Sequence, residues 1–234
     1  MRLDRWLGNR PELGRQLGRR LLAEGRVRVN GAITLQAERE VFAFDRIEAD
    51  ARLLQDGPGG RYLMLHKPRG CVSATVDARH RTVLDCLAAA ERADLHLAGR
   101  LDFNTTGLLL LTNDGQWSRG LSHPRHKQTK RYRVTTAEII PPQLVTAFAE
   151  GLYFAYEDLT TQPAQLELLD ERQAYLTLVE GRYHQVKRMF GRFGIEVVAL
   201  HRDRIGALPL DTALAEGSYR SLTADEVALL RPAD

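Results

Sequence analysis

Long apolar runs are missing from this chain of 234 residues. A helix that crosses a membrane needs about 20 consecutive apolar residues, and no stretch approaches that length. The first 20 residues mix arginines with acids and lack the apolar core of a signal peptide. With 44% hydrophobic and 27% charged residues, the composition is that of an ordinary globular protein. We therefore expect a cytoplasmic protein that does not enter a membrane.

Cysteine is also scarce, since Cys71 and Cys86 are the only two. In a cytoplasmic chain they are expected to be reduced thiols rather than a disulfide framework. The sequence contains no GxGxxG, Walker loop, HExxH or CxxC motif, which are the usual signs of dinucleotide, nucleoside triphosphate or zinc sites. His123 and His126 have the spacing of metal ligands, but no further ligands cluster beside them. No metal site is predicted.

Negative charge is rare in the first 30 residues, which hold eight arginines and three acids, although the whole chain has a net charge of only +3. Helical spacing places Arg15 and Arg19 on one face, and strand alternation does the same for Arg26 and Arg28. These four arginines could form one surface for nucleic-acid phosphates. A solvated face is the alternative, which arginines alone would favour. Their crowding into a short segment shifts the balance toward binding.

The same segment has the pattern of a small helix-helix-hairpin unit. Apolar residues at helical spacing predict two short helices, the first with Leu3, Trp6 and Leu7 and the second with Leu13, Leu17 and Leu21. Gly25 is placed to end the second helix in a left-handed conformation. Asn30-Gly31 lies between alternating apolar and charged residues, which is the strongest short signal for a hairpin turn.

Turn residues in Asp56–Arg61 (DGPGGR) mark a domain boundary near residue 57. A chain of this length favours two domains, here residues 1–57 and 58–234. Beyond the boundary, strand-like segments alternate irregularly with candidate helices, and these segments are residues 62–65, 108–111, 132–135 and 174–178. The irregular order predicts an α+β fold with a mixed, mainly antiparallel sheet.

Residues 99–115, GRLDFNTTGLLLLTNDG, join a polar turn to an unbroken apolar strand. Asp102 could simply accept hydrogen bonds from its own turn, and spacing alone favours that structural role. Asp114 is similarly placed to cap a helix containing Trp117 and Leu121. Local pattern therefore assigns no chemistry to either aspartate.

The wider string resembles the signature of the RsuA family of ribosomal RNA pseudouridine synthases. Further matches follow in order along the chain: LHKPRGCVSA at residues 65–74, KRYRV at 130–134, EGRYHQVKRMF at 180–190 and LHRDRIG at 200–206. RLDRWL and RRLLAEGRVRVNG, in roughly the first 50 residues, resemble the S4 RNA-binding fold. Two positions depart from these patterns, with His66 in place of the usual asparagine and Phe44 in place of a frequent glycine.

The resemblance implies roles for particular residues. Asp102 corresponds to the catalytic nucleophile, Tyr132 to the active-site tyrosine and Lys187 to a basic residue against the nucleophile. Lys187 lies at the border between an apolar helical face and Arg188, which suits a lysine whose ammonium enters a site. The expected active-site support is Tyr132, Lys187 and Arg100, and the expected RNA contacts are Arg15, Arg19, Arg26, Arg28, Lys130 and Arg188. Residues 119–133, with six basic residues and no acid, are a further candidate for the RNA backbone.

Pseudouridine formation breaks the bond between ribose C1′ and uracil N1 and joins C1′ to C5. Reactant and product are isomers, so no cofactor is expected. The carboxylate can attack C1′, as in retaining glycosidases, or a glycal can form first, and the sequence leaves both open. The resemblance is greatest to members that act on 16S rRNA, so the expected partner is 16S rRNA or a small-subunit assembly particle.

Two other functions remain possible at this stage: modification of 23S rRNA by the same chemistry, and a non-catalytic RNA-binding role in ribosome assembly. Loss of catalytic function would predict decay at the key positions, whereas Asp102, Tyr132 and Lys187 are all present. No obligate protein partner is indicated, and a monomer is expected.

Overall fold

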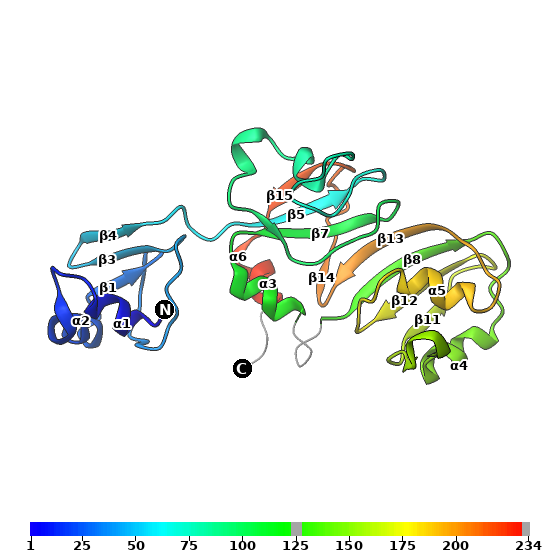
Figure 1. Cartoon of the computed structure of the whole chain (residues 1–234), viewed down its shortest axis with the longest axis horizontal. Coiled ribbons are helices and arrows are strands. Elements are labelled where there is room, and N and C mark those ends of the chain that lie inside the picture. Colours follow the sequence, from blue (N-terminus) through cyan, green and yellow to red (C-terminus); the bar gives the residue numbers. More distant parts are fainter. Residues whose placement is uncertain (123–127, 231–234) are drawn as a thin grey trace. The chain divides into compact units, whose positions relative to one another are not determined.

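The computed structural model describes residues 1–122 and 128–230 of the chain. Contacts divide the chain into two units, Met1–Arg61 and Tyr62–Asp234 (Figure 1). The division falls at the end of the DGPGGR segment, four residues after the boundary expected at residue 57. His123 and His126, together with the basic residues Arg125 and Lys127, lie outside the described residues. Within the described residues, no helix is long and apolar enough to cross a membrane.

The N-terminal unit packs two helices against a small antiparallel sheet. The helices are α1 (Leu3–Gly8) and α2 (Gly14–Ala23), and the strand order is β2 (Ala32–Ile33), β1 (Val27–Val29), β3 (Arg46–Ala49) and β4 (Arg52–Asp56). β1 and β2 form the predicted hairpin, with Asn30 and Gly31 at φ values of 54° and 81°. Positive φ at both central residues is the requirement of the tight hairpin turn that Asn-Gly favours.

The end of α2 confirms the predicted left-handed cap. Gly25 has a φ of 68°, and its N–H donates to the Leu22 carbonyl at 3.2 Å. The N–H of Arg26 donates to the Leu21 carbonyl at 2.9 Å, which completes a Schellman motif.

The buried face of α2 differs from the one the leucine spacing predicts. Leu17 is 38% exposed, whereas Gly18, Leu21 and Leu22 are buried. A Cβ atom at Gly18 would lie 3.0 Å from the Cβ of Leu7, so the glycine lets α1 and α2 cross closely. Of the expected stripe, Leu21 is buried and Leu13 packs against the same core, so the prediction was wrong only at Leu17. Gly18, which carries no hydrophobic signal, makes the contact with α1 instead.

The second unit is built on a mixed sheet. Its main strand order is β11-β12-β8-β13-β7-β5-β15, with β14 beside β13 and β6 beside β7 (Figure 1). The strand bounds are β5 Tyr62–Lys67, β6 His96–Leu97, β7 Thr106–Thr112, β8 Lys130–Thr136, β11 Gln165–Leu168, β12 Gln173–Leu178, β13 Val197–Ile205, β14 Leu208–Pro209 and β15 Tyr219–Ser221. Among the pairings of described residues in this sheet, only β13 with β7 is parallel. The α+β fold with a mainly antiparallel sheet is therefore confirmed, and the four predicted strand segments lie in β5, β7, β8 and β12.

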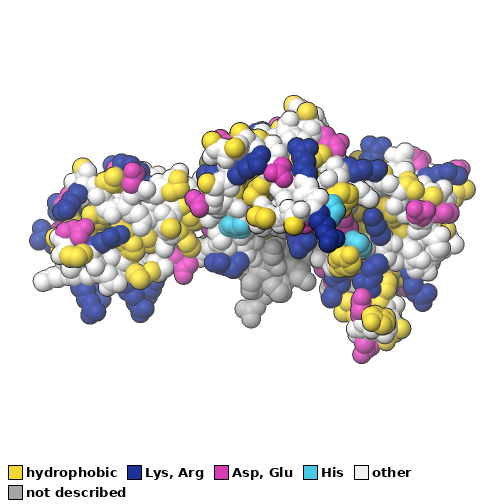
Figure 2. All heavy atoms as spheres, turned by 45° about the horizontal axis from the view of Figure 1, so that its top comes forward, with side chains coloured by type: hydrophobic (Ala, Val, Ile, Leu, Met, Phe, Trp, Pro, Cys, Tyr) yellow, Lys and Arg dark blue, Asp and Glu magenta, His cyan; other side chains and the backbone are white. Residues whose placement is uncertain are grey.

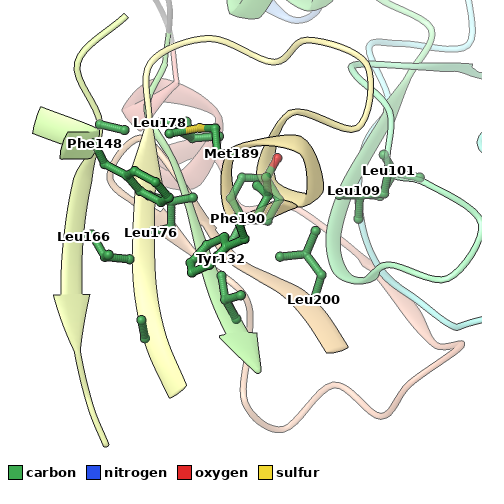
Figure 3. Packing of buried hydrophobic residues seen from close by; sticks show 14 of the residues in the cluster. Leu101, Leu109, Tyr132, Phe148, Leu166, Leu176, Leu178, Met189, Phe190 and Leu200 are labelled. Atoms are coloured by element: carbon green, nitrogen blue, oxygen red, sulfur yellow. The ribbon is translucent and has the colours of Figure 1, made fainter. Parts of the chain in front are cut away.

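Helices cover both faces of this sheet, which explains the unbroken leucine run in β7. Leu109 (Figure 3) and Leu111 belong to the larger core, to which α4 (Gln143–Glu150) and α5 (Gln185–Gly191) also contribute, whereas Leu108 and Leu110 share a second core with α3 (Gly115–Ser122) and α6 (Ala224–Leu229). All four leucines have no exposed surface. A strand buried on both faces needs no polar alternation.

Smaller elements complete the second unit. A two-stranded ribbon pairs β9 (Tyr153–Phe154) with β10 (Leu159–Thr160), and the short 3-10 helices are η1 (Val83–Cys86), η2 (Ala89–Glu91) and η3 (Ala155–Glu157). The helix predicted after Asp114 is α3, whose first turn Asp114 caps by accepting from the N–H groups of Gln116 and Trp117 at 2.9 and 3.0 Å.

Candidate active site

The parallel pairing of β7 with β13 determines the position of the loop that carries Asp102. A turn from Asp102 to Thr105 leads into β7, with the Thr105 N–H donating to the Asp102 carbonyl at 3.0 Å. Gly107, the second residue of β7, has a φ of 109°, and a Cβ there would overlap the backbone of Arg202 on β13. Glycine is required on both counts. The close approach brings the Asp102 turn beside Arg202.

A buried lysine at the end of β5 holds the same loop. The Lys67 ammonium donates to the carbonyls of Pro68, Phe103 and Thr105 at 3.0, 3.3 and 2.9 Å. Its side chain is completely buried, and burial lowers the pKa of Lys67. Two of its three acceptors follow Asp102 closely in the chain, so Lys67 fixes the position of that residue. The LHKPRG motif thus supports the site by holding the Asp102 loop, and its Lys67 does not itself line the cavity.

Asp102 opens onto a cavity of about 340 Å³. Five cationic side chains and two carboxylates line this catalytic cavity, namely Arg100, Lys130, Arg182, Lys187 and Arg202, with Asp102 and Glu180. The structure therefore brings together Asp102, Tyr132, Lys187, Arg100 and Lys130, which the sequence analysis singled out from separate motifs. The cationic excess suits an anionic ligand.

Tyr132 lies on β8 and is 7% exposed (Figure 3). Its hydroxyl oxygen accepts a hydrogen bond from Nη1 of Arg202 at 3.4 Å, and the guanidinium carbon lies 5.9 Å from the ring centroid. Arg202 itself is 2% exposed, and it donates to the carbonyls of Leu108 and Arg100 at 2.9 and 3.3 Å. Arg202 belongs to the LHRDRIG motif, but no pattern in the sequence assigned it a role.

His184 is a second residue at the site that sequence reasoning missed. Its Nε2 lies 3.6 Å from Oδ1 of Asp102, an ion pair when the imidazole is protonated. The residue precedes α5 in a left-handed conformation with a φ of 49°, and its ring stacks on Tyr183 with centroids 3.8 Å apart. Lys187 lines the cavity, but among the described residues no ion pair within 4 Å joins it to Asp102. Of the basic side chains that the structure describes, His184 is thus the one that lies within ion-pair distance of the Asp102 carboxylate.

Glu180 organises the segment between β12 and α5. Its side chain is 4% exposed, and it accepts from the Gln162 N–H at 3.0 Å, from Gln185 Nε2 at 2.6 Å and from Arg182 Nε at 3.0 Å. Buried carboxylates require such partners. The network fixes the segment that presents His184 to Asp102.

The fold and cavity can be compared with known proteins. Residues 61–191 match the sequence profile described as RNA pseudouridylate synthase. The chain belongs to this pseudouridine synthase family. Ribosomal small subunit pseudouridine synthase A of Pseudomonas aeruginosa is 55% identical to it, with 97% of this chain and 99% of that protein covered. The protein of the same name from Escherichia coli is 43% identical, with 97% and 99% covered. A crystal structure of a pseudouridylate synthase is 40% identical, has a TM-score of 0.72 and matches over 98% of this chain and 99% of that one.

The N-terminal arginines of this pseudouridine synthase fall into two groups. Arg15 and Arg19 are exposed on α2 and line an open groove with Arg2 and Arg5, and no ion pair of these two is present among the described residues. Arg26 is instead paired with Glu24 and Asp50, so its charge is offset. Arg28 donates to the carbonyl of Gly31 at 2.9 Å.

The candidate RNA contacts of the synthase domain are also engaged with protein groups. Arg188 forms an ion pair with Glu157 at 2.7 Å and lies 4.6 Å from the ring centroid of Phe154. Lys130 donates to the Gln128 carbonyl at 2.9 Å and lines the catalytic cavity. Figure 2 shows further lysine and arginine side chains spread over the visible surface, with acidic side chains among them. Part of the basic stretch 119–133 lies outside the described residues.

Proposed function

We propose that this pseudouridine synthase isomerises one uridine of 16S rRNA and that Asp102 acts on ribose C1′. The observation that carries the assignment of Asp102 is the contrast between the two carboxylates lining the catalytic cavity. Glu180 is 4% exposed and its oxygens accept from three donors, whereas the Asp102 side chain is 28% exposed and has the imidazole of His184 beside it at 3.6 Å. Only the Asp102 carboxylate is accessible for attack.

The reaction needs the target base to leave its stack and enter the cavity. The Asp102 carboxylate then bonds to C1′, or supports positive charge there, as the N1–C1′ bond breaks. Tyr132 borders the site of the base, and Lys187 and Arg100 supply positive charge beside the carboxylate. Lys130 and Arg188 are proposed contacts to the RNA backbone at the rim.

The substrate follows from the relatives. Two proteins that cover nearly the whole chain, at 55% and 43% identity, are named ribosomal small subunit pseudouridine synthase A. Small-subunit RNA is therefore favoured over the 23S alternative. An accessible carboxylate in a cationic cavity argues equally against a non-catalytic assembly factor.

We further propose that the N-terminal unit is an S4-like RNA-binding domain. Its helix-helix-hairpin order supports this role, as do the exposed Arg15 and Arg19, which form no ion pair with any residue that the structure describes. The proposal includes residues 1–57 as the binding domain, residues 58–234 as the catalytic domain, a monomeric enzyme without an obligate protein partner, and a cytoplasmic location, where ribosomal RNA is processed in bacteria.

Substrate choice is tested by incubating the protein separately with 16S and 23S transcripts and with a partly assembled small-subunit particle, followed by pseudouridine mapping. We expect one modified uridine in 16S rRNA, on the transcript or the particle, and none in 23S. Modification of 23S alone would overturn the substrate assignment. Absence of pseudouridine from all three, with RNA binding retained, would favour the assembly factor.

A further inference from the structure

Arg202 carries a hydrogen-bond donor that the protein does not use. Its Nε donates to Leu108 and its Nη1 to Arg100 and Tyr132, but its Nη2 is buried and has no partner among the described residues. More than 90% of buried polar groups in folded proteins are paired. A guanidinium has donors and no acceptor, so the group that pairs with Nη2 must be an acceptor.

The position of Arg202 limits what that acceptor can be. The residue lines the catalytic cavity together with Asp102 and Tyr132. Its contact to the Arg100 carbonyl ties it to the segment that carries the nucleophile, two residues before Asp102. Thr105, whose hydroxyl is also buried without a partner among the described residues, lines the same cavity. Two unpaired polar groups therefore border the space next to the reacting carboxylate.

We propose that Arg202 is a catalytic residue that donates from Nη2 to a carbonyl oxygen of the target uracil. This inference rests on the proposed function of the cavity. Uracil presents two carbonyl oxygens, O2 and O4, and both are acceptors. The guanidinium is held by two backbone carbonyls and the Tyr132 hydroxyl, so it is already oriented before the base arrives. Such fixed donors stabilise developing negative charge at little reorganisation cost.

The electron count of the reaction shows where that charge develops. When the N1–C1′ bond breaks, its electron pair remains with the base and spreads over N1, O2 and O4. After the base turns, an electron pair of the ring forms the C5–C1′ bond. If Asp102 has bonded to C1′, its carboxylate leaves in this step with the electron pair of the Asp102–C1′ bond. The proton on C5 is then lost and N1 gains a proton, so the product is an isomer of the reactant. Arg202 keeps its protons throughout and stabilises the anionic base between the two steps.

A chemical double-mutant cycle tests this role. The RNA is a 16S fragment whose mapped target carries oxygen, sulfur at position 2 or sulfur at position 4, because sulfur is the weaker hydrogen-bond acceptor. Single-turnover rates are measured at saturating protein for the wild type and Arg202→Met. On unmodified RNA we expect Arg202→Met to be slower by roughly 100-fold, the usual cost of one donor to a developing anion. On one thiolated RNA this penalty should shrink by about tenfold.

Arg204→Met provides the matched control. Arg204 lies two residues further along β13 and also has a buried unpaired nitrogen, its Nε, among the described residues, but it does not line the cavity. Its penalty, of whatever size, should be equal on all three RNAs. Unfolding curves show which variants are folded, and Arg202→Lys, which keeps the charge but loses the fork, replaces Arg202→Met in the cycle if the latter unfolds.

An equal Arg202 penalty on all three RNAs would overturn the proposal and leave Arg202 with a purely structural role. Failure of the wild-type protein to modify the oxygen-containing RNA would instead refute the proposed function. The two failures are therefore distinguishable within one experiment.

Discussion

The arginines of the N-terminal unit and those of the catalytic cavity carry the same charge but are held in different ways. Arg15 and Arg19 are exposed, with no ion pair among the described residues. Arg202 is 2% exposed and bonds two backbone carbonyls and a tyrosine hydroxyl. Exposed cations bind phosphates through interactions that salt screens, whereas buried donors act at short range and are screened little. From this difference we propose that the first unit provides RNA affinity and the second provides the chemistry.

The largest expected effect is that of Asp102→Asn, which should abolish catalysis and leave RNA binding intact. Asp102→Asn should remove pseudouridine formation, because the amide keeps the shape of the side chain but cannot act as the nucleophile. RNA affinity should stay within a few-fold, since the binding cations are untouched. Single-turnover assays and filter binding on the same 16S transcript measure both quantities. Turnover close to the wild type would refute the assignment.

Lys187 tests whether a cation of the catalytic cavity supports the reaction or binds RNA, because it lines the cavity without forming an ion pair with Asp102. Lys187→Met should lower the single-turnover rate by roughly 100-fold while leaving the salt dependence of RNA binding unchanged, if its ammonium supports the carboxylate in the transition state. A phosphate contact predicts the reverse, with normal rate at saturation and a salt slope reduced by roughly 0.7 on single-stranded RNA. The second pattern would move Lys187 to the RNA-binding residues.

Replacing Gly107 tests whether the second unit depends on the close packing of β7 against β13. Gly107→Ala should lower the free energy of unfolding by about 2–4 kcal/mol, because it combines a φ of 109° with an overlap against the Arg202 backbone. Gly191→Ala is the control, since a Cβ there meets nothing within 4 Å and its φ is not positive. Denaturant unfolding measures both. Equal stability of the two variants would contradict the close packing of β7 on β13.

The predicted effect in the N-terminal unit is on binding alone. Arg15→Gln together with Arg19→Gln should reduce the slope of log affinity against log salt by about 1.4, or roughly 0.7 for each phosphate contact, and should leave the rate at saturation unchanged. Arg26→Gln should reduce the slope less, because Glu24 and Asp50 already offset its charge. Equal slopes for the double variant and the wild type would show that these arginines are only solvated.

The smallest expected effect is on stability between pH 7 and 5, the range in which histidines titrate, and residues 1–61 contain no histidine. Burial, with a contribution from His66, lowers the pKa of His201. A lowered folded-state pKa means that the unfolded chain binds the proton first, so stability falls as pH decreases below about 6.5. His66→Asn should lessen this loss, because it removes a like charge 5.4 Å away between ring centroids. Thermal unfolding between pH 5 and 7 measures the change, and an unaltered pH dependence would contradict the coupling.

Local pattern predicted those parts of the molecule that short-range physics determines. The Asn30-Gly31 turn, the left-handed Gly25 and the Asp114 cap each depend on a few neighbouring residues, and each is present. The apolar run Leu108–Leu111 was predicted as a strand, and it lies in β7. Side-chain burial was less predictable, since Leu17, one of the leucines expected on the apolar face of α2, is 38% exposed.

The site needed more than local pattern. Asp102 in isolation favoured a structural turn, and its chemical role came from the family resemblance. Arg202 reaches the cavity only because β13 lies parallel to β7, a pairing of residues almost 100 positions apart that no local signal encodes. His184 faces Asp102 because its backbone is left-handed, and the buried Glu180 network holds that segment. Motif membership was the one signal that pointed to either residue.

The salt dependence of the wild-type enzyme tests the division between binding and chemistry most directly. RNA affinity and the single-turnover rate at saturating protein are measured together between 50 and 200 mM salt. The affinity should fall steeply, by roughly tenfold or more if several phosphates are contacted, while the rate at saturation stays within about twofold. A rate at saturation that falls in parallel with affinity would contradict the account, because the cations of the catalytic cavity would then be acting as screened phosphate contacts.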